Sequence, residues 1–229
     1  MKTSLLILVF ALVLSSCSIQ PRASWVTTTE NEPWQEQSDL VSASSDTIPT
    51  IDAVIHTHKK GQKIDGFGAC FNELGWISLS KLDPTVREEI MEELFFPEIG
   101  ANFTICRMPV GANDFSRDWY SYNETEGDFE MEYFTIANDQ QTLIPFIKGA
   151  QKYNSDRIWA SPWCPPSWMK YNKHYASAYT GEAYNEKYRN GLPADKVGYE
   201  GTDMFIQDSL YLQSYALYFS QFIEAYREQ

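Results

Sequence analysis

The chain has 229 residues and carries 31 acidic against 18 basic side chains, which gives a formal net charge of −13 at pH 7. Affinity for nucleic acids depends on Lys and Arg side chains that neutralise phosphates, so this balance argues against a nucleic-acid partner. We interpret the acidic excess as a solvated surface.

The first sixteen residues are typical of a secretory signal peptide. Lys2 precedes an apolar run from Leu5 to Leu14, which is shorter than the roughly 20 residues that a membrane-spanning helix needs. The run ends in Leu-Ser-Ser-Cys, which fits the bacterial lipobox. We predict that residues 1–16 are removed and that Cys17 is acylated. The protein would then be a secreted, lipid-anchored protein of the cell envelope, at the outer membrane of a Gram-negative bacterium; the alternative is an ordinary signal peptide followed by a chance cysteine.

Residues 17–49 are predicted to form a disordered tether behind the lipidated cysteine. They are rich in Ser, Thr, Glu, Gln and Pro, with only scattered apolar residues. Such a segment cannot bury enough apolar surface to offset the entropy lost on ordering.

From residue 50 onward, short β-type runs alternate with helical patterns, which predicts an α/β fold with parallel strands. Residues 51–59 are expected to form an isolated strand, and residues 66–72 the first buried strand. A helix is predicted to begin at Asp83-Pro84, which supplies an N-cap and a proline at the first helical position. Its apolar face is marked by Val86, Ile90 and Leu94.

Two further strand–helix units follow. The second has a strand at 103–110, a long polar and aromatic loop at 111–139 and a helix at about 140–153. The third has a strand at 157–163, a loop of over forty residues and a helix from about Asp208. The face of that last helix is marked by aromatic residues: Tyr211, Tyr215, Phe219, Phe222 and Tyr226.

Long loops after strands and short returns from helices favour a (β/α)₈ TIM barrel, in which functional residues collect at the C-terminal ends of the strands. A doubly wound open sheet is the less favoured alternative, because the Gly-Phe-Gly at residues 66–68 lacks the third glycine of a dinucleotide-binding loop. Only about the first three of eight units are expected in this chain. The last helix ends without a Gly, Asn or Pro stop signal, so we expect a truncated sequence.

The remaining cysteines show no zinc or disulfide framework. Cys70, Cys106 and Cys164 each lie in an apolar or aromatic stretch, which favours free thiols over a Cys70–Cys106 disulfide. His56 and His58 lie two residues apart without further ligands, which favours a surface position over a metal site. We expect no metal ion and no cofactor.

Three motifs occur in order: Asp-Gly-Phe-Gly-Ala at 65–69, Ile-Cys-Arg-Met-Pro-Val-Gly-Ala-Asn-Asp-Phe-Ser at 105–116, and Trp-Ala-Ser-Pro-Trp-Cys-Pro-Pro-Ser-Trp-Met-Lys at 159–170. Together they resemble glycoside hydrolase family 30, the glucosylceramidase-like group, here of the Bacteroidetes lipoprotein type. The resemblance covers residues 50–229. It implies a TIM barrel with a β-sandwich side domain, to which the strand at 51–59 would belong.

The resemblance also implies retaining hydrolysis of β-glycosides, which needs two carboxylates about 5 Å apart. In the family these are glutamates at the ends of the fourth and seventh strands, so both lie beyond this sequence. We therefore assign no catalytic residue here, and neither Glu73 nor Asp114 is taken as acid or nucleophile. The fragment alone is predicted to be inactive.

Three supporting residues match family positions, and a fourth is predicted beside them. Arg107 resembles the arginine that hydrogen-bonds near the nucleophile, and a guanidinium can orient a carboxylate and keep it ionised. Asp114 resembles the aspartate that accepts hydrogen bonds from sugar hydroxyls, Trp163 the tryptophan that closes the same subsite, and Trp168 is predicted to form a pocket wall. The alternatives are a structural ion pair for Arg107 and core packing for both tryptophans.

The expected partner is a carbohydrate or glycolipid, with membrane association through the lipid anchor. Aromatic residues in the loops after the second and third strands suit pyranose rings, and we expect a minority of them to contact substrate. Residues 171–207 depart from the shorter loop of human-type glucosylceramidases, which leaves the β-glycoside open. A non-catalytic glycan-binding surface lipoprotein and an inactive fragment are the alternative functions.

Overall fold

A computed structural model describes residues 24–40, 53–97, 99–153, 155, 157–177, 191–198 and 201–229. The chain divides into two compact units, Met1–Gln62 and Lys63–Gln229. The predicted signal peptide and Cys17 lie outside the described residues, as do two of the loop tyrosines, Tyr179 and Tyr184. None of the helices in the described part has the length and hydrophobicity to cross a lipid bilayer.

The first unit contains a short hairpin that the composition did not indicate. Strand β1 (Val26–Thr27) pairs antiparallel with β2 (Gln35–Glu36), so the predicted tether is ordered at this point. The prediction of a strand at 51–59 is wrong for its described part, because residues 53–59 form no strand and end in a turn. That turn is closed by a hydrogen bond from the backbone N–H of Lys59 to the carbonyl of His56 (2.9 Å). A β-type pattern becomes a strand only with a partner, and none is available among the described residues.

The second unit is built on parallel strands, as predicted. Strand β3 (Ile105–Val110) pairs with β4 (Arg157–Pro162), with Arg107 opposite Trp159. The predicted first strand is an extended segment beside β3, joined by the Cys70–Arg107 bridge. Gly68 is required there, because a Cβ would lie 1.5 Å from the carbonyl oxygen of Ile105.

Two helices follow this first segment in the chain. Helix α2 (Glu73–Leu79), which the sequence did not predict, is capped by Asn72, whose side chain accepts from the N–H of Gly75 (2.7 Å). Helix α3 (Pro84–Phe95) begins at the predicted Asp83 cap. Its predicted face is only partly correct: Leu94 packs partly buried against the core, but the buried residues are Met91 and Phe95, and Val86 is 43% exposed.

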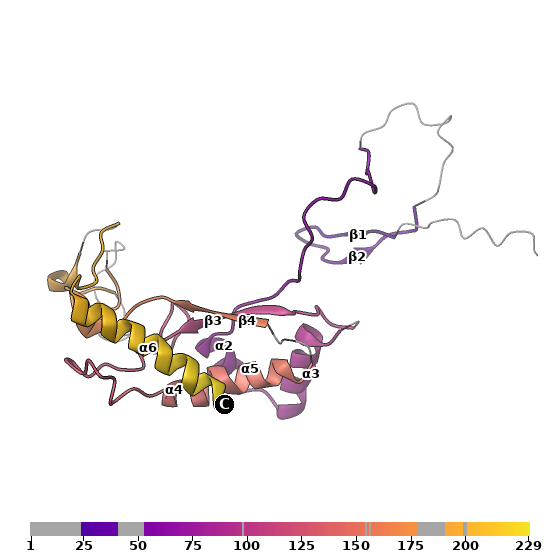
Figure 1. Cartoon of the computed structure of the whole chain (residues 1–229). Helices are drawn as coiled ribbons and strands as arrows, with labels where there is room; N and C mark the ends of the chain where they lie inside the picture. Colours follow the sequence, from indigo (N-terminus) through magenta and orange to yellow (C-terminus); the bar gives the residue numbers. More distant parts are fainter. Residues whose placement is uncertain are drawn as a thin grey trace, which may run out of the picture. The chain divides into compact units, whose positions relative to one another are not determined.

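The remaining helices follow β3 and β4. The predicted helix at 140–153 is two helices, α4 (Ala137–Gln141) and α5 (Leu143–Gln151). Helix α6 (Ser209–Arg227) begins after Asp208, as predicted, and short 3₁₀ turns occur at Ser167–Met169 and Ala194–Lys196. Figure 1 shows α2, α3 and α5 on the same side of β3 and β4.

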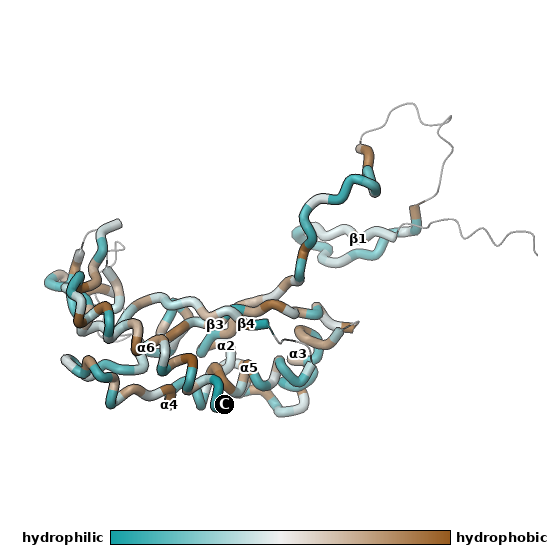
Figure 2. Tube along the Cα trace, viewed as in Figure 1, coloured by the Kyte–Doolittle hydropathy of each residue, from teal (hydrophilic) through white to brown (hydrophobic). Residues whose placement is uncertain are grey.

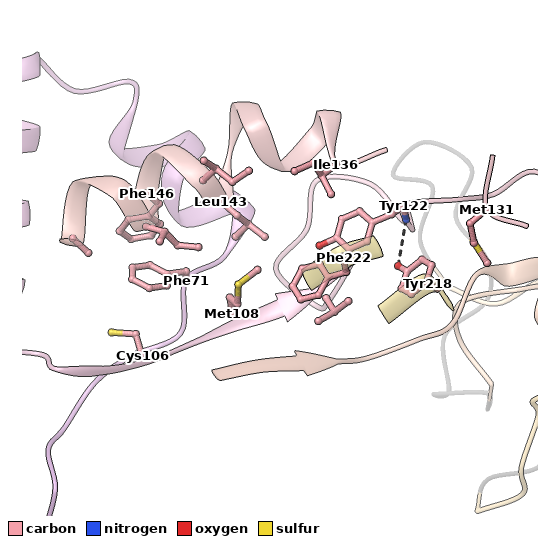
Figure 3. Close-up of a cluster of buried hydrophobic side chains, with 14 of the residues drawn as sticks. Phe71, Cys106, Met108, Tyr122, Met131, Ile136, Leu143, Phe146, Tyr218 and Phe222 are labelled. Carbon is pink, nitrogen blue, oxygen red and sulfur yellow. Dashed lines mark hydrogen bonds between the residues drawn. The ribbon is translucent and has the colours of Figure 1, made fainter. Parts of the chain in front are cut away.

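The core of the second unit lies between the helices and one face of β3. Phe71 contacts Phe146 edge-on, with 5.0 Å between ring centroids, and Met108 lies nearby in the same cluster (Figure 3). On α6, the most buried aromatic is Tyr218, which the predicted face omitted. Hydrophilic and hydrophobic residues alternate along α6 (Figure 2), as expected for a helix with one buried face.

Candidate functional site

The two faces of β3 separate core residues from site residues. Cys106, Met108 and Val110 are buried in the cluster covered by helices. Side chains alternate along a strand, so Arg107 projects from the opposite face, in register with Trp159 of β4. The face away from the helices therefore carries the polar and aromatic residues of the motifs.

Arg107 lies against two indole rings. Its guanidinium carbon is 5.3 Å from the ring centroid of Trp159 and 5.1 Å from that of Trp163, which are cation–π distances. Its Nη2 donates to the Oγ of Ser161 (3.0 Å), while its buried Nε has no acceptor among the described residues. The alternative of a structural ion pair therefore has no support in the described part of the chain, and one N–H group remains available to a carboxylate.

A cavity of about 170 Å³ lies where the loops after β3 and β4 meet. Its walls come from both loops and combine one carboxylate with three aromatic rings. The lining residues are Ala112, Asn113, Asp114, Trp119, Trp163, Cys164, Tyr175 and Ala176. The predicted site residues Asp114 and Trp163 thus line one cavity. Arg107 does not line it but packs against Trp163, which does.

A local turn presents Asp114. Gly111 has a φ of +79°, a conformation that favours glycine. The Oδ1 of Asn113 then accepts from the N–H of Phe115 (2.9 Å), while the N–H of Asn113 donates to the Oγ of Ser116 (2.9 Å). Asp114 itself is exposed, and its carboxylate makes no hydrogen bond to a described residue. Its oxygens are available to a ligand.

Aromatic side chains form the rest of the wall. Trp163 is half-exposed. Trp119 packs edge-on against His174, with 4.5 Å between ring centroids, and lies 6.1 Å from Tyr175. Of the loop aromatics in the described residues, Trp119 and Tyr175 therefore reach the cavity, whereas Tyr122 belongs to the core.

Trp168 is placed elsewhere. It is 4% exposed, donates through Nε1 to the carbonyl of Asn123 (3.1 Å) and packs edge-on against Phe129. It does not line the cavity. This position speaks against the predicted role as a pocket wall and corresponds to the alternative, core packing.

Four cavity residues were not assigned by sequence reasoning: Ala112, Asn113, Cys164 and Ala176. Cys164 is one of three free thiols in the described residues, and burial raises its pKa to about 11, so it is a neutral thiol near neutral pH. Ala176 has no chemical signature in the sequence. Only the position of Cys164 directly after Trp163 in the third motif could have indicated that this thiol is near the site.

Glu73 is a structural carboxylate. It is buried and accepts hydrogen bonds from the N–H of Arg117 (2.8 Å) and from Nδ2 of Asn138 (3.2 Å). These bonds tie the start of α2 to the loop after β3 and to helix α4. Within the described ranges, no group of three or more His, Cys, Asp or Glu side chains could hold a metal ion.

Comparisons with known proteins agree with this geometry. A candidate glucosylceramidase of Caenorhabditis elegans is 34% identical, covering 82% of this chain and 32% of its own. The lysosomal acid glucosylceramidase of Mus musculus is 29% identical, covering 75% and 30% respectively. A solved endo-β1,6-glucanase superposes with a TM-score of 0.61 at 25% identity, covering 90% of this chain and 40% of its own.

The chain spans about a third of the length of the curated relatives it matches. Residues 64–191 match the glycosyl hydrolase family 30 TIM-barrel domain, which includes β3, β4 and the cavity residues from Ala112 to Ala176. The α/β fold class and the barrel architecture are thereby established. With the motifs, the parallel strands and this match in agreement, the chain belongs to glycosyl hydrolase family 30.

Proposed function

We propose that the protein carrying this chain hydrolyses β-glycosidic bonds with retention, and that the cavity beside Asp114 binds a sugar ring. The observation that carries the proposal is the exposed carboxylate of Asp114, which has no partner among the described residues and lies in a cavity walled by Trp119, Trp163 and Tyr175. A carboxylate accepts hydrogen bonds from sugar hydroxyls, while aromatic faces suit the apolar faces of pyranose rings.

The reaction itself needs two further carboxylates. Retaining hydrolysis uses an acid/base and a nucleophile about 5 Å apart, and Asp114 is the one carboxylate among the described residues lining the cavity. We place both glutamates outside residues 1–229, at the ends of the fourth and seventh barrel strands. Arg107, whose Nε has no acceptor among the described residues, would then orient the nucleophile and hold it ionised.

We also propose that residues 67–71, β3 and β4 are the first three strands of the barrel. Among the described residues, β4 pairs with β3 alone, and its Trp159 is 56% exposed. A barrel closes only when every strand edge is paired, so the next strand would pair with β4 and cover Trp159.

The substrate class follows from the relatives. They are named as glucosylceramidases and as endo-1,6-β-glucanases, so we propose a β-linked glucoside, either a glycolipid or a glucan.

Retention is tested with the full protein that the gene encodes. With an aryl β-glucoside, NMR during the first minutes should show the β-anomer of the released sugar, because two inversions restore the starting configuration. An α-anomer as first product would contradict the proposed mechanism. Binding without turnover would favour the alternative, a non-catalytic glycan-binding surface protein.

We further propose that the mature protein is a cell-envelope lipoprotein acylated at Cys17. The support is the order of charge, apolar run and cysteine in residues 1–17. When cells that express the protein are fed radiolabelled palmitate, the wild type should incorporate label and Cys17→Ala should not. Equal labelling of both would contradict the anchor.

A further inference from the structure

Lys170 is a buried lysine beside the cavity. It follows the 3₁₀ turn Ser167–Met169 and is only 4% exposed. Burying an ammonium group is costly unless acceptors surround it, and no carboxylate pairs with Lys170 in the described part of the chain. A structural reason is therefore needed for its position.

The acceptors around Lys170 come from one short segment of the loop after β4. Its Nζ donates to the carbonyl of Tyr175 (2.7 Å), to the Oγ of Ser177 (2.9 Å) and to the carbonyl of Ala176 (3.4 Å). The Sγ of Cys164 lies 3.8 Å away. Three of the four neighbours, Tyr175, Ala176 and Cys164, line the cavity.

Tyr175 is held at both ends. Lys170 holds its carbonyl, and its hydroxyl donates to the Oε1 of Glu124 (2.8 Å) in the loop after β3. The same carboxylate accepts from the N–H of Ser167 (3.1 Å), which directly precedes the buried Trp168. The ring of Tyr175 is thus fixed between the two loops that form the cavity.

We propose that Lys170 is a positioning residue of the sugar-binding cavity, which acts by holding residues 175–177 in the cavity wall. This inference rests on the proposed function of that cavity. Lys170 is not catalytic, because its ammonium group donates hydrogen bonds to residues 175–177 and does not itself line the cavity. Its loss should therefore affect substrate binding more than the chemical step.

The test compares Lys170→Met with Lys173→Met in the full protein. Lys173 lies in the same loop but is exposed and paired with Glu126, away from the cavity. For an aryl β-glucoside, we expect Lys170→Met to raise KM about ten-fold, equivalent to about 1.4 kcal/mol, while kcat changes less. Lys173→Met should leave both constants unchanged.

A double-mutant cycle separates positioning from general stabilisation. If Lys170 acts through Tyr175, the KM of Lys170→Met/Tyr175→Ala should not exceed that of the more affected single variant. KM increases that multiply in the double variant would overturn the inference, as would a folded Lys170→Met enzyme with wild-type KM.

If Lys170→Met does not fold, Ser177→Ala is the second test. It removes one acceptor of the Lys170 ammonium group and should still raise KM several-fold. A wild-type KM in that variant would overturn the inference.

Binding is measured independently of turnover by tryptophan fluorescence, since Trp119 and Trp163 line the cavity. A wild type that binds the glucoside without hydrolysing it, with affinity lost in Lys170→Met, would refute the proposed catalysis and support the positioning role. A wild type that neither binds nor hydrolyses β-glucosides would refute both.

Discussion

Replacement of Asp139 by Ala is expected to lower the free energy of unfolding by roughly 3–5 kcal/mol. Asp139 is fully buried and accepts hydrogen bonds from three tyrosine hydroxyls. These come from Tyr120 (2.7 Å), Tyr122 (2.6 Å) and Tyr226 (2.5 Å). Removing the carboxylate leaves these hydroxyls without their acceptor in a largely buried cluster, and each buried unsatisfied group costs roughly 1–3 kcal/mol.

The measurement is thermal or urea unfolding of the full protein. Tyr226→Phe removes one hydroxyl from the cluster and should cost about 1 kcal/mol. Tyr211→Phe is its control on the same helix. The hydroxyl of Tyr211 makes no hydrogen bond to a described residue, so this change should leave the free energy of unfolding unchanged. A melting temperature of Asp139→Ala close to that of the wild type would mean that the tyrosines find other acceptors.

The cluster also predicts a pH dependence. Burial raises the pKa of Asp139 above its ordinary value, although hydrogen bonds from Tyr122, Tyr226 and Tyr120 oppose the shift. A raised pKa in the folded state contributes stability that is complete below the unfolded pKa of about 3.9 and is lost as pH rises through the folded pKa. The stability advantage of the wild type over Asp139→Asn should therefore shrink as pH rises above about 4. An advantage that grows with pH would show that the hydrogen bonds outweigh burial.

Asp114→Ala is expected to lower kcat/KM by about ten-fold to a thousand-fold with little change in melting temperature. One charge-assisted hydrogen bond is worth roughly 1.5–3 kcal/mol, and each 1.4 kcal/mol corresponds to a factor of ten. The carboxylate is exposed and bonds to no described residue, so its loss removes nothing from the fold.

Asp118→Ala is the matched control for Asp114→Ala. Asp118 lies four residues further along the same loop, is paired with exposed Arg117 (3.2 Å) and does not line the cavity. An exposed ion pair contributes roughly 0–1 kcal/mol, so this variant should keep wild-type kinetics. Destabilisation of Asp114→Ala with unchanged kinetics in the folded enzyme would remove Asp114 from the site.

Local signals explain what the sequence could predict. Asp83 and Asp208 are caps whose side chains accept from the N–H groups of Thr85 and Leu210, and such caps act within one helical turn. The strands β3 and β4 were found because short apolar runs bounded by polar residues are visible in the chain. Asp114 and Trp163 were identified because they match family positions in the second and third motifs, in the segments that follow these strands.

Contacts between distant segments explain what the sequence could not predict. The role of Asp139 depends on Tyr226, 87 residues away, and the face of α6 is set by Tyr122, which stacks on Tyr218 and Phe222. Trp168 and Trp163 lie in one motif, yet Trp168 packs in the core and Trp163 lines the cavity. Residue type could not separate them, because an indole suits both environments.

The separation between Asp139 and Tyr226 has a consequence during synthesis. At about 5–20 residues per second, the ribosome needs roughly 4–17 s to add the residues that lie between them. Throughout that interval, Asp139 can meet Tyr120 and Tyr122 but not the hydroxyl supplied by α6. This carboxylate therefore lacks its third hydrogen-bond donor until α6 has been made and has docked.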